Sequence, residues 1–174
     1  MVSLPWAWLA LLGVVAAERV AERVVARRNA AWSFARGGVE YGAGHYPVMV
    51  ALHAGFLLGM LLEVWLLQRS FLPALGLPCL GLVVLAQALR WWVIRTLGPR
   101  WNTRVIVIPG LPPVEAGPFR WLRHPNYVAV GVEGIALPLV HTAWVSALVF
   151  TLANALLLFV RIGVEDRALG RTGA

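Results

Sequence analysis

Five apolar stretches, separated by arginine-rich segments, constrain the fold of this chain more than any other feature. They cover residues 2–17, 46–67, 71–89, 127–140 and 142–160. A helix that crosses a bilayer needs about 20 apolar residues. Hydrophobic residues fill 60% of the 174 positions and charged residues only 13%, which is too little charge to cover a soluble domain of this size. The sequence therefore predicts one membrane domain, residues 1–174, that is all-α with five transmembrane helices.

The distribution of arginine predicts the orientation of these helices. The chain has fifteen basic residues, all arginine: five lie in residues 18–45, six in residues 90–126 and three after residue 160, against Arg69 alone elsewhere. Positive residues gather in the cytoplasmic loops of membrane proteins. The predicted topology therefore has the N-terminus outside and residues 18–45 and 90–126 in the cytoplasm. A bacterial plasma membrane is the expected location, since arginine without lysine is typical of GC-rich bacterial genomes.

The first stretch has two interpretations, a cleaved signal peptide or a retained helix. A signal peptide carries positive charge before its apolar core, whereas here the arginines follow it. This order favours a retained helix. Arg19, Arg23 and Arg27 recur every four residues, so the helix is expected to continue as a charged cytoplasmic extension.

The second and third stretches are separated by Gln68, Arg69 and Ser70, so we expect them to form an antiparallel hairpin. His53 and Glu63 lie in the second stretch. Neither has a polar partner nearby in the sequence, which favours a structural role over ligand binding for both.

Residues 90–126 combine six arginines with Trp91, Trp92, Trp101 and Trp121. Such residues can stack on nucleic acid, but tryptophan beside arginine at the ends of spans is also the usual interfacial belt. The second interpretation needs no additional partner, so no nucleic acid is expected. Residues 105–108 are expected to be extended, before breaks at Pro109-Gly110 and Pro112-Pro113.

Polar residues gather around the last two apolar stretches. The segment Gly117–Tyr127 (GPFRWLRHPNY) lies where the chain enters the fourth stretch, and Asn126 and Glu133 share one helical face beyond it. On the fifth stretch Asn154, Arg161 and Glu165 are seven and four residues apart and share another face.

Two explanations of these polar faces are open. In the first, Arg161 pairs with Glu165, Glu133 pairs with an arginine, and Asn154 forms a hydrogen bond between helices. In the second, the polar groups converge on a ligand, since ionisable groups inside spans usually mark functional sites. Their number at one end of a small bundle favours the second explanation.

The segments Gly117–Tyr127 and Arg161–Asp166 (RIGVED) resemble motifs of the isoprenylcysteine carboxyl methyltransferase family, integral membrane enzymes that use S-adenosylmethionine. The similarity covers about residues 85–169. Residues 89–102 (LRWWVIRTLGPRWN) are similar to a bacterial branch that O-methylates long-chain polyketides such as alkylpyrones and alkylresorcinols, often beside a type III polyketide synthase. The Arg-His-Pro-x-Tyr motif alone is shared with sterol reductases, and the added Arg-x-x-x-Glu motif favours methyl transfer.

The resemblance implies a cytoplasmic cofactor pocket at the last helical hairpin. Its expected S-adenosylmethionine contacts are His124, Tyr127, Asn154, Arg161 and Glu165, and its expected catalytic residues are His124, Glu133 and Arg161. A hydroxyl acceptor with a pKa near 10 would need a general base, for which Glu133 or His124 is the candidate, whereas a carboxylate acceptor needs none. The chain departs from relatives at Asp166, where they have glutamate, and at Ala174, where many continue into an aromatic-rich tail that closes the cofactor site.

Two other functions share some of these features. A membrane reductase of the sterol-reductase type would bind a nicotinamide, and a scaffold or small transporter would need neither His124 nor Glu165. No metal is expected, because the sequence lacks His-x-x-x-His and paired-acid spacings. The leading prediction is an S-adenosylmethionine-dependent O-methyltransferase for a lipophilic acceptor in the bilayer, carrying either a hydroxyl group or a prenylcysteine-like carboxylate.

Overall fold

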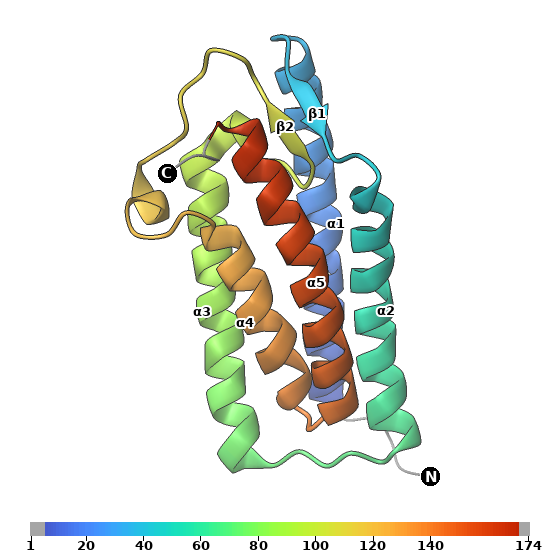
Figure 1. The fold of residues 1–174 in the computed structure, drawn as a ribbon. Helices are drawn as coiled ribbons and strands as arrows, with labels where there is room; N and C mark the ends of the chain where they lie inside the picture. Colours follow the sequence, from blue (N-terminus) through green and yellow to red (C-terminus); the bar gives the residue numbers. More distant parts are fainter. Residues whose placement is uncertain (1–5, 171–174) are drawn as a thin grey trace.

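The fold is a bundle of five helices with a two-stranded antiparallel sheet at one end, here called the sheet end (Figure 1). The computed structural model describes residues 6–170, so residues 2–5 of the first predicted span lie outside it. In chain order the elements are α1 (Trp6–Phe34), β1 (Val39–Tyr41), α2 (His45–Leu66), α3 (Pro73–Leu97), η1 (Gly98–Arg100), β2 (Val105–Val107), η2 (Gly117–Arg120), α4 (Pro125–Leu139) and α5 (Trp144–Ala168). Within residues 6–170 each predicted apolar stretch lies almost entirely in one helix, and the sheet is an addition to the all-α prediction.

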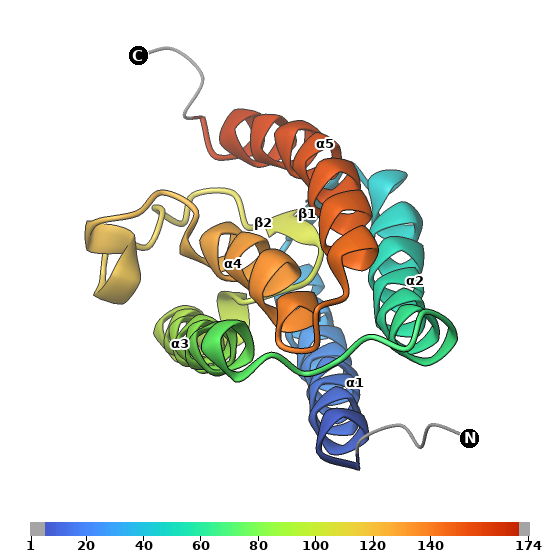
Figure 2. The same cartoon turned by 90° about the horizontal axis from the view of Figure 1, so that it is seen from below.

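The apolar core fills the half of the bundle farther from the sheet. Helix α4 packs between α3 and α5, α5 also packs against α2, and α1 lies between α2 and α3 in the view along the bundle (Figure 2). Met60 and Leu137 are fully buried in this core. A Cβ atom on Gly134 would lie 2.5 Å from the Phe150 ring, so glycine is what lets α4 and α5 approach there. A second apolar cluster surrounds Trp101 near the sheet end.

Helix α1 continues without a break from its apolar beginning into the arginine-rich segment. The predicted charged extension is therefore confirmed as helix up to Phe34. Its inward face carries Glu22, Ala26, Ala30 and Ser33, all buried, so the extension forms one wall of the bundle.

The predicted hairpin of the second and third stretches is wrong. Helices α2 and α3 run in opposite directions, but they are not neighbours, and the connection between them crosses the end of the bundle (Figures 1 and 2). Leu66 ends α2 and Pro73 begins α3, so the connection has six residues, which can reach about 20 Å when extended. Leu72 is extended because a residue before proline disfavours the helical region.

Glu63 has the structural role predicted for it. Its carboxylate accepts hydrogen bonds from the backbone N–H groups of Val145 at 3.1 Å and Ser146 at 2.7 Å, which cap the first turn of α5. It also pairs with Arg69 at 2.9 Å. This one side chain therefore joins α2 to the beginning of α5.

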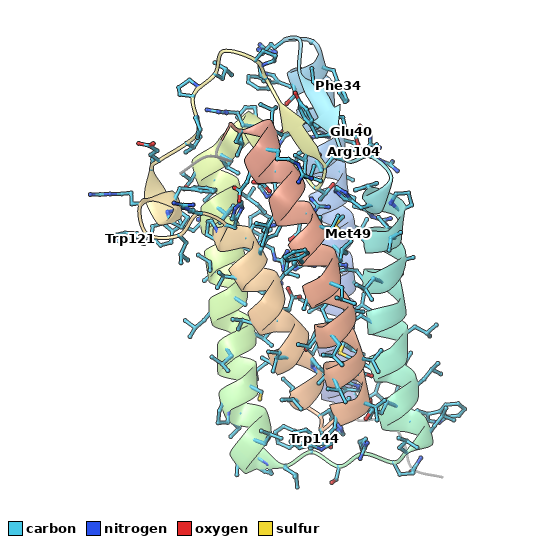
Figure 3. All side chains as sticks on the ribbon, in the orientation of Figure 1. Phe34, Glu40, Met49, Arg104, Trp121 and Trp144 are labelled. Atoms are coloured by element: carbon cyan, nitrogen blue, oxygen red, sulfur yellow. The ribbon has the colours of Figure 1, made fainter. Side chains whose placement is uncertain are left out.

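The sheet joins two distant parts of the chain. Val39, Glu40 and Tyr41 pair with Val107, Ile106 and Val105 in antiparallel register, and the predicted extended piece at residues 105–108 is confirmed. Glu40 and Arg104 form an ion pair of 3.2 Å across the sheet (Figure 3). The loops after α1 and α3 therefore fold together over one end of the bundle.

Three helices in the described part of the chain are long and apolar enough to cross a membrane: His45–Leu66, Pro73–Arg100 and Trp144–Ala168. Helix α4 has 15 residues and measures about 22 Å at 1.5 Å per residue, less than the roughly 30 Å of a hydrocarbon core. Its beginning lies below the sheet-end tips of α3 and α5 (Figure 1). The three long apolar helices indicate an integral membrane protein. Five crossings and an outside N-terminus remain predictions.

Candidate functional site

The beginning of α4 and the last turns of α5 bring several of the predicted residues together. Pro125 begins α4, so His124 and Tyr127 lie at its first turn. The Tyr127 hydroxyl donates a hydrogen bond of 2.5 Å to Oε2 of Glu165. His124 Nδ1 lies 3.7 Å from Oε1 of the same carboxylate, and His124 Nε2 lies 3.1 Å from Oδ1 of Asp166. The prediction that residues from the beginning of α4 and from the last turns of α5 converge is therefore met for His124, Tyr127 and Glu165.

The pKa of His124 is raised above its ordinary value, chiefly by its interaction with the Glu165 carboxylate. An imidazolium with a raised pKa stabilises the folded state fully below the unfolded pKa of about 6.5, and this contribution is lost as the pH rises through the folded pKa. We therefore expect the melting temperature of the detergent-purified protein to fall as the pH rises above about 6.5. His124→Gln should lack this part of the decrease, and equal pH dependence in both proteins would contradict the prediction.

Arg161 is buried, with 4% of its surface exposed. Its guanidinium donates to the carbonyl oxygen of Thr103 at 2.9 Å and contacts the Met49 sulfur at 2.8 Å. No carboxylate in residues 6–170 lies within ion-pair distance of it, so the local Arg161–Glu165 pair considered from the sequence does not form, and Nε has no hydrogen-bond partner. A buried guanidinium without a carboxylate partner destabilises the folded protein unless an anion neutralises it.

A cavity of about 460 Å³ extends from this cluster into the bundle, with walls from α1 to α5 and from β2. Asn154 lines it and is 3% exposed, and its Oδ1 atom has no hydrogen-bond partner among residues 6–170. The Oδ1 atom of Asn126, also in the lining, is likewise buried and has no hydrogen-bond partner among these residues. Buried polar atoms are normally hydrogen-bonded, so this cavity suits a small molecule that supplies donors to both amides.

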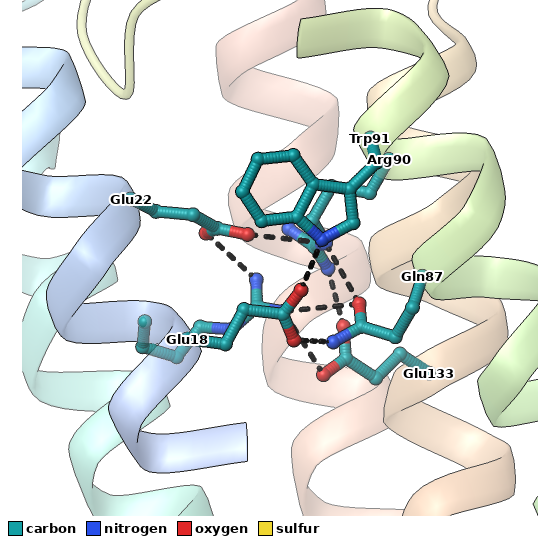
Figure 4. A network of polar contacts seen from close by, with 7 residues as sticks. Glu18, Glu22, Gln87, Arg90, Trp91 and Glu133 are labelled. Carbon is teal, nitrogen blue, oxygen red and sulfur yellow. Dashed lines mark hydrogen bonds and ion pairs between the residues drawn. The ribbon is translucent and has the colours of Figure 1, made fainter. Parts of the chain in front are cut away.

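Glu133 also lines the cavity, but about 9 Å farther along α4 than Tyr127 at 1.5 Å per residue. It pairs closely with Arg90 of α3 and, at 3.5 Å, with Arg19 of α1 (Figure 4). Glu22 lies 2.9 Å from Arg19 and 3.6 Å from Arg90. The alternative that Glu133 pairs with an arginine is therefore confirmed, and the structure does not bring Glu133 into the His124 cluster.

We call the residues joined to Glu133 the deep network. It connects α1, α3 and α4 and consists of Glu18, Arg19, Glu22, Gln87, Arg90, Trp91 and Glu133 (Figure 4). The sequence placed the α1 members in a charged cytoplasmic extension and did not predict their ion pairs and hydrogen bonds with α3 and α4. The available signal was the spacing of Arg19 and Glu22, which puts two charges on one helical face beside buried Ala26.

Comparison with known proteins places the chain among relatives of similar length. It is 38% identical over 163 residues to the uncharacterized protein YpbQ of Bacillus subtilis (strain 168), covering 93% of this chain and 95% of that protein. An uncharacterized protein of Haemophilus influenzae is 28% identical over 136 residues, 78% of each chain. A family model matches residues 79–171, close to the extent expected from the motifs, and supports a methyltransferase-type function in a membrane. The chain belongs to the isoprenylcysteine carboxyl methyltransferase (ICMT) family.

Proposed function

We propose that this protein is an S-adenosylmethionine-dependent O-methyltransferase that modifies a lipophilic acceptor. The acceptor carries either a phenolic or enolic hydroxyl, as in a long-chain polyketide, or a prenylcysteine-like carboxylate. The observation that carries the proposal is the buried guanidinium of Arg161, which lines the cavity one turn from Glu165 and has no carboxylate partner among the described residues.

The residues at the cavity mouth fit the chemical groups of S-adenosylmethionine. Arg161 would neutralise its carboxylate, and Glu165 would accept from its ammonium group through charge-assisted hydrogen bonds. Asn154 would accept from a further donor with its unpartnered Oδ1 atom. His124 and Tyr127, whose rings stack 5.4 Å apart, hold the Glu165 carboxylate in place. When bound, the molecule supplies an activated methyl group on its sulfonium sulfur.

The rest of the cavity suits an apolar acceptor. Its lining includes Ala16 and Val20 from α1 and Val50, Ala54 and Leu57 from α2, which offer an apolar surface to a hydrocarbon chain. Such walls exclude water from the reacting atoms. Most of the rate enhancement would come from holding the acceptor oxygen about 3–3.5 Å from the methyl carbon.

The proposed setting is the bacterial plasma membrane, with the site open to the cytoplasm. The arginine distribution supports this orientation, because the cavity mouth lies beside the segments that carry thirteen of the fourteen arginines in residues 6–170. A type III polyketide synthase is a candidate source of the acceptor.

Calorimetric titration with S-adenosylhomocysteine tests the proposal. We expect the detergent-purified wild type to bind it, and Glu165→Ala to bind it at least about tenfold more weakly, since a charged hydrogen bond contributes about 1.5–3 kcal/mol. Glu115→Ala, which removes an exposed carboxylate from the loop before η2, should bind like the wild type.

The same protein should transfer labelled methyl groups from S-adenosylmethionine to a component of a bacterial lipid extract. A folded wild type that binds no S-adenosylhomocysteine and labels no lipid would overturn the proposal. Binding of NADPH by that protein would point to the reductase alternative.

A further inference from the structure

We propose that His53 is the general base of this site and that the acceptor group it serves is a hydroxyl. The inference rests on the proposed methyl transfer and names the class of oxygen that is methylated. It concerns a residue of α2, outside the segment 79–171 that the family model covers.

His53 lies between Arg161 and the deep network. It lines the cavity one helical turn after Met49, and the Met49 sulfur contacts Arg161 at 2.8 Å. Met49 lies on α2 below the sheet (Figure 3). At 1.5 Å per residue, His53 is about 6 Å deeper along α2 than this contact. The charged groups that face its ring are Arg19, Arg90 and Glu133 of the deep network.

The hydrogen bond of the His53 ring determines which nitrogen can act as a base. Nδ1 lies 2.8 Å from the backbone carbonyl oxygen of Met49. A carbonyl oxygen only accepts hydrogen bonds, so Nδ1 carries the proton and Nε2 keeps a free lone pair. Nε2 has no hydrogen bond within residues 6–170. The ring is also held edge-on against Phe150, with centroids 5.2 Å apart and planes at 85°.

The two bases considered from the sequence are already engaged. Both ring nitrogens of His124 face carboxylates, and both carboxylate oxygens of Glu133 face arginines. An amine or imidazole nitrogen that accepts a proton must have an unoccupied lone pair. Within the described part of the cavity lining, His53 meets this requirement.

A free base in the cavity favours a hydroxyl acceptor. A hydroxyl must lose its proton when its oxygen is methylated, whereas a carboxylate is already ionised and needs no base. The unoccupied Nε2 atom of His53 would therefore serve a hydroxyl and have no use for a carboxylate.

The step balances in atoms and electrons. A lone pair of the acceptor hydroxyl oxygen forms the new bond to the methyl carbon, and the carbon–sulfur bond breaks with its electron pair remaining on sulfur. The hydroxyl proton moves to Nε2 of His53. The products are a methyl ether, a neutral thioether and a protonated His53, which returns its proton to solvent before the next cycle.

A chromophoric acceptor analogue tests this role without catalysis. A nitrophenol that bears a pentadecyl chain is titrated into the protein saturated with S-adenosylhomocysteine, and the nitrophenolate absorption band is recorded. We expect the bound probe to ionise at lower pH than in detergent micelles alone, because imidazolium and phenolate form an ion pair. His53→Gln should abolish this shift and leave the affinity for S-adenosylhomocysteine unchanged.

His141→Gln is the matched control. His141 is a buried histidine at the turn between α4 and α5, and it does not belong to the cavity lining. This variant should keep the spectral shift. A probe that does not bind, or a shift that survives in His53→Gln, would overturn the proposal while leaving the binding of S-adenosylhomocysteine, and thus the proposed function, intact.

The methylation rates of wild type and His53→Gln provide a second test of the general base. His53→Gln should slow methylation of pentadecylphenol about 10²–10⁴-fold, the usual contribution of a general base, and added imidazole should restore part of the rate. If His53→Gln does not fold, the probe titration on wild type alone decides, because the absence of any shift in the ionisation of the bound nitrophenol would overturn the proposal.

Discussion

Arg161→Met should lower the affinity for S-adenosylhomocysteine by between about 30-fold and several thousand-fold, since removing one partner of a buried charge pair costs about 2–5 kcal/mol. The effect is large because Arg161 is 4% exposed and its guanidinium has no carboxylate partner within residues 6–170. A cofactor carboxylate that lost this partner would be left beside a buried position without its compensating positive charge. Calorimetry on the detergent-purified variant measures the change.

Two further variants show whether position or charge matters. Arg161→Lys keeps the charge but cannot donate in two directions at once, so we expect an intermediate loss. Arg167→Met removes an exposed arginine from the last turn of the same helix and should bind like the wild type. Wild-type affinity in Arg161→Met would exclude Arg161 from the cofactor site.

Arg90→Met should destabilise the protein by about 3–5 kcal/mol, the usual cost of leaving a buried carboxylate unpaired. Arg90 is 5% exposed and contacts both Glu22 and Glu133, which are 5% and 7% exposed. Its removal leaves Arg19 as the cation that must balance both carboxylates. Denaturant unfolding in detergent, compared with the wild type, measures the difference.

Combining Arg90→Met with Glu133→Gln should recover part of this loss, because the double variant no longer buries the uncompensated charge. Arg95→Met, an exposed substitution on the same helix, should change stability by less than about 0.5 kcal/mol. Equal stability of Arg90→Met and Arg95→Met would show that the deep network contributes nothing to folding.

The sequence predicted the helices well because their signals are local. Apolar length located all five, and the prolines at positions 73 and 125 lie where α3 and α4 begin. The packing of α2 and α3 was predicted wrongly, because the three residues between the apolar stretches indicated a tight turn, whereas the connection has six residues and crosses the end of the bundle. Which of the two forms depends on the helices that pack between them, and no local pattern encodes that choice.

The candidate site was predicted in part for the same reason. His124, Tyr127 and Glu165 lie in two short motifs, so their convergence followed from one hairpin. Arg19 and Glu133 come from distant parts of the chain, and only the bundle brings them together. The hydrogen-bond partner of His53 is a backbone carbonyl of its own helix, which composition cannot reveal.

The cavity lining comes both from residues before the family segment and from residues within it, and this division bears on how relatives diverge. The residues proposed to hold the cofactor lie within the family segment 79–171, whereas His53, Arg19 and the apolar lining from α1 and α2 precede it. Under the proposed function, selection for a new acceptor can act on the first two helices while the proposed methyl-donor site stays constant. Exchanging residues 1–66 between two relatives should transfer acceptor preference with them, so that the first two helices would act as an exchangeable specificity module in evolution.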